Sequence, residues 1–188
     1  MLKPIAITGK FRSGKDTVAA HLVERYGYTR FAFGDELKRY ANELFPAESA
    51  DGRKPRELYQ WFGQAMRQRD PDVWVRKCFD NISWSYKIAE NNGGSIVGTP
   101  VVISDLRQPN EFDRCRAEDY VIIRVTRPDS DRLATAAATD NFDDTAVTHE
   151  TESYVDGFAV DYEIINDGTV DELLRKVDEV LTKINGGR

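Results

Sequence analysis

The chain has 188 residues, of which 40% are hydrophobic and 31% are charged, and its formal net charge is −6 at pH 7. This length and balance predict one soluble globular domain, residues 1–188, with a sizeable core. The acidic charge argues against a general nucleic-acid binder, and no apolar run approaches the ~20 residues that cross a membrane.

Because the sequence opens directly into its first predicted strand, we expect no signal peptide. Its two cysteines, Cys78 and Cys115, lie far apart and lack metal-ligand spacing, so we expect free thiols in a reducing cytoplasm. Basic residues dominate as far as about Lys87, which suits a site for anionic substrates.

The first predicted strand, 5–8, and the first predicted helix, 14–26, flank a glycine-bounded loop. This loop, residues 9–17, reads Gly-Lys-Phe-Arg-Ser-Gly-Lys-Asp-Thr. A strand, a glycine-bounded loop, a lysine, a hydroxyl residue and a helix in this order are typical of a phosphate-binding P-loop. The sequence therefore predicts a polyphosphate ligand, against the alternative of a chance glycine turn.

Each loop residue has a physical reason to be there. Gly9 can turn the chain sharply, and Gly14 lets backbone N–H groups approach phosphate oxygens. The helix directs its free N–H groups at the same phosphates, and Lys15 adds a mobile positive charge. Thr17 can offer a hydroxyl to Mg²⁺ or to the α-phosphate. The usual pattern has Ser or Thr directly after the lysine; Asp16 stands there instead, and its carboxylate could hold the metal through water.

A second strand is predicted at 30–33 and a second helix at 35–44. At their junction, Asp35 could accept hydrogen bonds from a sugar or base, and Lys38 could meet a phosphate. The alternative is that Asp35 is a plain helix N-cap.

Two further helices are predicted at 55–68 and 72–90. Gly63 costs about 1 kcal/mol relative to Ala in mid-helix, which indicates close packing or ligand approach. Gln64 and Arg67 lie about one turn apart and could bind the base and phosphate of a nucleotide. The alternative is that Arg67 is a solvated helix arginine.

The third predicted strand, 101–104, runs into Asp105 ahead of a helix at 108–118. In P-loop enzymes an acid at this place often orients Mg²⁺. Asp105, Arg107 and Glu111 would cluster where the strand opens into the helix. Alternatively, Asp105 is an N-cap and the other two form a surface ion pair.

The fourth predicted strand, 121–125, is followed by Arg127 and then Arg132. Arginines here could neutralise charge on a transferring phosphoryl group, and Arg124 is a weaker candidate of the same kind. The segment 128–157 is acidic and rich in small residues, which suggests a lid over the substrate, against the alternative of a surface loop.

The last predicted strand, 162–165, is followed by Asn166-Asp167-Gly168, whose backbone could border an adenine base or form a plain turn. Thr169 and Glu172 then form a capping box for a helix at 170–184. Strands that alternate with helices predict a three-layer α/β fold with a five-stranded parallel sheet. Ligands bind at the carboxyl ends of such strands, where Gly9, Asp35, Asp105, Arg127 and Asn166 would lie.

These residues resemble the phage-type deoxynucleoside monophosphate kinases, a branch of the P-loop nucleoside monophosphate kinase fold. The segments that carry the resemblance are 9–17, 33–38, 56–67, 104–111, 149–152 and 165–168. The first and fourth are specific and the others are loose. One departure is that the expected lid holds little arginine; Arg12, inside the loop, could substitute.

The resemblance implies ATP as phosphoryl donor, Mg²⁺, and a deoxynucleoside monophosphate as acceptor. It also implies a helical acceptor-binding region at about 35–98. We expect the protein in the cytoplasm, that of a host if the chain is phage-encoded. Whether it forms a homodimer stays open. His149 would close the lid through a hydrogen bond, and His21 would be structural. The alternatives are a kinase for another small phosphate acceptor, such as dephospho-coenzyme A, and a non-catalytic ATP-binding module.

The expected site residues fall into four groups. The catalytic residues would be Lys15, Arg12, Arg127 and Asp105. The ATP-binding residues would be Gly9, Ser13, Gly14, Lys15, Asp16, Thr17, Asn166 and Gly168. The acceptor-binding residues would be Lys10, Asp35, Lys38, Gln64, Arg67, Arg107, Glu111 and Arg132. The metal-binding residues would be Asp16, Thr17 and Asp105.

Overall fold

The computed structural model describes residues 2–49, 55–91, 99–129 and 154–186. The chain divides into two compact units, one made of Met1–Arg30 and Val97–Arg188 and the other of Phe31–Ile96. None of the helices in the described ranges is long and apolar enough to cross a membrane.

A five-stranded sheet in the order β2-β3-β1-β4-β5 organises the first unit. At its centre, β1 (Ile5–Thr8) pairs in parallel with β3 (Val101–Leu106) and β4 (Val121–Thr126), and β4 pairs in parallel with β5 (Tyr162–Ile165). Every residue of β1 is buried, as expected for an apolar strand covered on both faces. The predicted parallel sheet is therefore confirmed.

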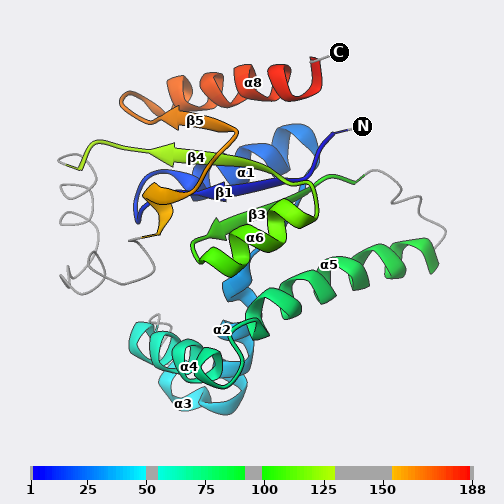
Figure 1. Ribbon diagram of the computed structural model, residues 1–188, viewed down its shortest axis with the longest axis vertical. Helices are drawn as coiled ribbons and strands as arrows, with labels where there is room; N and C mark the ends of the chain where they lie inside the picture. Colours follow the sequence, from blue (N-terminus) through cyan, green and yellow to red (C-terminus); the bar gives the residue numbers. More distant parts are fainter. Residues whose placement is uncertain (1, 50–54, 92–98, 130–153, 187–188) are drawn as a thin grey trace. The chain divides into compact units, whose positions relative to one another are not determined.

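Helices α1 (Lys15–Tyr26), α6 (Pro109–Ala117) and α8 (Val170–Gly186) complete the first unit, with a short 3₁₀ helix, η3, at Val155–Gly157. The apolar faces of α1 and α8 share one core cluster with the central strands. Figure 1 shows α6 in front of the sheet, on the face opposite α1. Helices on both faces of the sheet make the three-layer α/β fold.

The second unit is built from helices α2 (Phe33–Leu44), α3 (Pro46–Ser49), α4 (Arg56–Arg69) and α5 (Val73–Asn91). Its core contains Leu37, Ala41, Leu58, Phe62 and Trp74. A Cβ on Gly63 would lie 2.5 Å from a methyl carbon of Leu37, and the carbonyl of Gly63 accepts a hydrogen bond from the Trp74 indole at 3.2 Å. Close packing between α2 and α4 therefore explains the glycine in mid-helix.

Two predicted boundaries are corrected by the structure. Strand β2 is Thr29–Phe31 rather than 30–33, because Ala32 already serves as the N-cap of α2. Asp35 is thus inside the helix, and its reading as an N-cap is wrong. Gln108 is the N-cap of α6 and Asp105 lies within β3, so the reading of Asp105 as an N-cap is also wrong.

Candidate phosphate-binding site

The loop between β1 and α1 depends on two glycines. Gly9 has a φ of 144° and Gly14 a φ of 107°, both in the region that side chains disfavour. A Cβ on Gly9 would lie 2.2 Å from the Val125 carbonyl oxygen, and one on Gly14 would lie 2.7 Å from the side-chain nitrogen of Asn166. Both glycines are therefore required by the conformation of the loop as well as by its spacing.

Lys15, the first residue of α1, is only 6% exposed, and its Nζ donates a hydrogen bond to the Lys10 carbonyl at 2.7 Å. The N-cap Gly14 has no side chain to cap the first turn of the helix. Such an uncapped N-terminus favours an anion, through its free N–H groups and its dipole.

Two hydroxyls in and beside the loop are buried without a hydrogen-bond partner among the described residues: Oγ1 of Thr8 and Oγ of Ser13. Buried polar groups in proteins are normally paired, because an unpaired one costs free energy. Unused hydroxyls beside an uncapped helix N-terminus fit a ligand with several acceptor oxygens, such as a polyphosphate.

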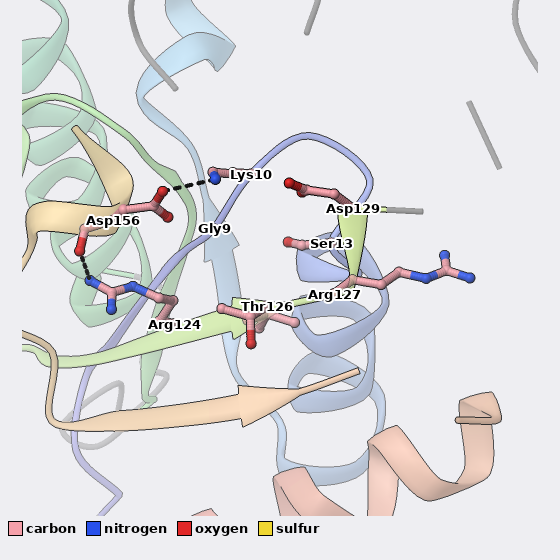
Figure 2. Close-up of a pocket in the computed structure, with 9 residues that line it drawn as sticks. Gly9, Lys10, Ser13, Arg124, Thr126, Arg127, Asp129 and Asp156 are labelled. Atoms are coloured by element: carbon pink, nitrogen blue, oxygen red, sulfur yellow. Dashed lines mark hydrogen bonds and ion pairs between the residues drawn. The ribbon is translucent and has the colours of Figure 1, made fainter. Parts of the chain in front are cut away.

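A pocket opens beside this loop, at the carboxyl end of β4. It is lined by Gly9, Lys10, Ser13, Arg124, Val125, Thr126, Arg127, Asp129 and Asp156. Figure 2 shows the side chains of Lys10 and Asp156 facing each other, while the side chain of Arg127 extends away from them. The Lys10 Nζ lies 2.8 Å from a carboxylate oxygen of Asp156.

Arg124, the weaker candidate in the sequence analysis, lines this pocket. Its Nη2 donates to the backbone carbonyls of Asp156 at 3.1 Å and Phe158 at 2.5 Å, which ties η3 to the end of β4. Asp156, Asp129 and Thr126 were not predicted as site residues. The adjacency of β1 and β4 could have suggested Thr126 and Asp129, but no local signal in the sequence places Asp156 beside Lys10.

Arg12 has a left-handed backbone with a φ of 62°, and its guanidinium lies over the Phe11 ring, 5.3 Å from the ring centroid.

Among the expected metal-binding residues, Asp16 and Thr17 are exposed on the first turn of α1, and Asp105 is half-buried in β3. Carboxylate and hydroxyl oxygens are ligands that Mg²⁺ prefers. Within the described ranges, no group of three or more His, Cys, Asp or Glu residues could hold a metal unaided. A Mg²⁺ ion bound through Asp16, Thr17 or Asp105 would therefore need further ligands, such as phosphate oxygens.

At the end of β5, the side-chain amide of Asn166 donates to the Ser13 carbonyl at 3.0 Å, so the structure brings Asn166 to the loop. Gly168 has a different explanation. A Cβ there would lie 2.0 Å from the Glu172 carboxylate, which accepts the Thr169 N–H at 2.7 Å in the predicted capping box. The hydrogen bond from the Thr169 backbone lowers the pKa of Glu172.

Glu111 is 3% exposed, and one of its carboxylate oxygens accepts the backbone N–H groups of Arg107 at 2.8 Å and Gln108 at 2.9 Å. This is a capping box that begins α6. Its burial shows that Glu111 does not lie on the surface, where the alternative of a surface ion pair with Arg107 had placed it. The carboxylate has a structural task that competes with its predicted contact to an acceptor.

The remaining acceptor candidates lie in the second unit. In α2, the Lys38 Nζ is 3.8 Å from the Asp35 carboxylate, and both side chains are partly exposed. In α4, Gln64 is exposed and Arg67 is half-buried one turn later. The structure thus places these four side chains on a compact unit separate from the loop.

Several other expectations concern residues outside the phosphate-binding loop. Arg132, His149 and most of the segment 128–157 lie outside the described residues. His21 contacts the Asp178 carboxylate at 2.6 Å, between α1 and α8, which agrees with a structural role. Cys78 and Cys115 are buried thiols that form no disulfide with each other, and burial raises the pKa of the Cys115 thiol.

A parallel α/β sheet with this loop defines a P-loop protein. A protein-family model described as an AAA domain matches residues 5–147, most of the chain. The chain belongs to this family.

A protein of Acanthamoeba polyphaga mimivirus that bears the name "Putative deoxynucleotide monophosphate kinase" is 27% identical to the chain over 146 residues. The match covers 66% of this chain and 74% of the relative.

Solved structures show the same fold over nearly the whole chain. TT1252 from Thermus thermophilus has a TM-score of 0.58 at 23% identity, covering 98% of this chain and 100% of its own. A gluconokinase from Sinorhizobium meliloti 1021 has a TM-score of 0.55 at 16% identity, with 98% and 94% covered. A dephospho-CoA kinase from Campylobacter jejuni has a TM-score of 0.53 at 13% identity, with 100% and 99% covered. These likenesses show that the chain shares its fold with proteins that include kinases.

Proposed function

We propose that the protein transfers the γ-phosphoryl group of ATP to a nucleoside or deoxynucleoside monophosphate, giving the diphosphate. The observation that carries the proposal is the loop itself, with an uncapped helix N-terminus, a buried lysine and two unused hydroxyls around one turn. The mimivirus relative supports a nucleotide monophosphate as the acceptor.

In this proposal the loop amides, Ser13 and Lys15 hold the β- and γ-phosphates of ATP. Lys15 already lies against the loop, and its ammonium would exchange the Lys10 carbonyl for phosphate oxygens. Phosphoryl transfer at a P-loop depends mostly on positioning and on charge, so the protein needs to contribute little further chemistry. Mg²⁺, held by Asp16, Thr17 and Asp105 with the nucleotide, would neutralise phosphate charge.

The acceptor phosphate would meet cations around the pocket at the end of β4. Lys10 is well placed among these, because its ammonium already lies at the pocket, where it pairs with Asp156. A dianionic phosphate competes well with one exposed carboxylate for an ammonium group. Arg12 and Arg127 would neutralise charge that develops during transfer.

The helical unit Phe31–Ile96 would read the rest of the acceptor. Asp35 and Gln64 offer hydrogen-bonding groups for a base or sugar, and Lys38 and Arg67 offer positive charge. Arg107, at the start of α6 in the first unit, would offer a further positive charge, whereas the carboxylate of Glu111 keeps its capping role. The protein would act in the cytoplasm on small nucleotides, without nucleic acid or membrane as partner.

The experiment is acceptor-dependent ADP release with Mg-ATP across the common ribo- and deoxyribonucleoside monophosphates. Dephospho-coenzyme A, gluconate and shikimate serve as acceptors outside the nucleotide class. We expect at least one nucleoside monophosphate to stimulate ADP release well above the other three. Stimulation by dephospho-coenzyme A alone would move the chain to another class of kinase, and stimulation by no acceptor would refute kinase activity.

A further inference from the structure

We propose that Asn166 is a positioning residue for the phosphate-binding loop, whose side-chain amide orients the Ser13–Gly14 peptide so that the Gly14 N–H faces the phosphates. The sequence alone had left Asn166 as a backbone border for adenine or as part of a plain turn. The inference rests on the proposed binding of a polyphosphate by the loop, and it does not depend on which acceptor is phosphorylated.

The first argument is the contact between two distant parts of the chain. The Asn166 Nδ2 donates to the Ser13 carbonyl oxygen at 3.0 Å. The backbone around Asn166 is itself held in place, because its N–H donates to the Thr126 carbonyl at 2.7 Å, at the end of β4. The Lys176 ammonium also donates to the Ile165 carbonyl at 2.7 Å. The amide therefore reaches the loop from a fixed support.

The second argument is the packing on Gly14. A Cβ at Gly14 would lie 2.7 Å from the Asn166 Nδ2 and 3.4 Å from a methyl carbon of Leu173. With a φ of +107°, Gly14 also has a backbone conformation that only glycine adopts readily. The Asn166 amide thus occupies the space where other residues carry a side chain, and it touches the loop at Gly14.

The third argument is the geometry of the peptide bond. In a planar trans peptide the C=O and the following N–H point in opposite directions. When Asn166 binds the Ser13 carbonyl, the Gly14 N–H must point away from β5. Glycine peptides can flip at low cost, because glycine populates both signs of φ. A donor on the Ser13 carbonyl therefore selects one of two orientations for an N–H that a phosphate needs.

Two substitutions distinguish this role from an effect of side-chain size and from a contact with the adenine base. Asn166→Asp keeps the size of the side chain, but a carboxylate cannot donate to the Ser13 carbonyl and repels it. Asn166→Ala removes the amide. The matched control is Asp167→Asn, because Asp167 is the next residue in the same turn and its side chain pairs with Lys176 on the surface, 2.6 Å away.

The experiment measures binding of Mg-ATP and of Mg-tripolyphosphate to the full chain by calorimetry. Tripolyphosphate has the phosphates of ATP but no base. We expect Asn166→Asp to raise the Kd of both ligands by the same factor, about tenfold, which corresponds to about 1.4 kcal/mol of binding free energy. Asn166→Ala should weaken both equally by a smaller factor, and Asp167→Asn should change neither. Weakening of ATP alone would assign Asn166 to the base and overturn the proposal, as would unchanged binding of both ligands.

A second measurement starts from the wild-type protein, so its first result does not depend on the folding of a variant. With ¹⁵N-labelled glycine, tripolyphosphate should shift the Gly14 amide resonance, and Asn166→Ala should reduce that shift. An unmoved Gly14 resonance in saturated wild-type protein would contradict the proposal. Neither measurement includes an acceptor, so a failure of phosphoryl transfer in the acceptor panel is seen separately.

Discussion

The phosphate-binding loop and the helical unit Phe31–Ile96 hold their expected site residues in different ways. In the loop, the contacts run through the backbone: Gly9 lies against the Val125 carbonyl, Asn166 binds the Ser13 carbonyl, and Lys15 binds the Lys10 carbonyl. In the helical unit, two expected site residues, Lys38 and Asp35, pair through side chains at 3.8 Å, and these side chains are 38% and 40% exposed.

This difference separates two tasks. Phosphate groups are alike in all nucleotides, so a rigid backbone cradle suits them, and preorganisation lowers the entropy that binding costs. Acceptors differ in base and sugar, which exposed side chains can adapt to. We therefore expect substitutions in the loop to affect all activity or folding, and substitutions in the helical unit to affect the choice and affinity of the acceptor.

The largest expected effect is that of Lys15→Ala. Loss of the ammonium removes a positive charge from the phosphates, and we expect acceptor-dependent ADP release to fall by about 10²- to 10³-fold. Thermal unfolding of the same preparation checks that the fold is kept. Retained turnover in folded Lys15→Ala protein would place the phosphate site elsewhere.

Gly9→Ala tests whether the folded protein depends on the close packing of the loop against β4. The new Cβ would meet the Val125 carbonyl at 2.2 Å, so we expect the free energy of unfolding in urea to fall by about 2–3 kcal/mol. Gly27→Ala is the matched control, because Gly27 also has a positive φ, 71°, but no atom lies within 4 Å of an added Cβ. We expect it to cost about 1 kcal/mol. Equal losses would show that the loop is not held against β4.

Arg67→Ala tests the helical unit. We expect the KM for the monophosphate acceptor to rise about tenfold, or about 1.4 kcal/mol, with little change in the KM for ATP. Arg69→Ala, on the same helix and exposed, is the control and should change neither constant. If Arg67→Ala raised the KM for ATP instead, the division of tasks between the two regions would be wrong.

The smallest effect concerns the core beneath the loop. Tyr28 is 2% exposed, and burial raises its pKa to about 12 from the ordinary value of 10. The unfolded chain therefore loses this proton first, and the contribution of Tyr28 to stability is complete below pH 10 and falls as the pH rises toward 12. Urea unfolding at pH 8, 10 and 11 should show a decline that Tyr28→Phe lessens. An identical decline in both proteins would contradict it.

The sheet, the loop and most helices could be predicted because each leaves a local signal: apolar runs, glycines around a lysine, or a capping box. The contacts that give the site its shape could not. Asp156 meets Lys10, and Arg124 ties η3 to β4, only because strands distant in sequence are neighbours. From the sequence, Glu111 was predicted to contact the acceptor, and Gly63 to mark close packing or ligand approach. In the structure, Glu111 caps α6 and close packing explains Gly63.

The most direct test follows the fate of the γ-phosphate. The protein is incubated with Mg-ATP labelled in its γ-phosphoryl group and with a mixture of nucleoside monophosphates, and the labelled products are identified by mass spectrometry. We predict that the label moves into a nucleoside diphosphate and that Lys15→Ala protein does not transfer it. Label found only as inorganic phosphate, or left in ATP, would contradict the account.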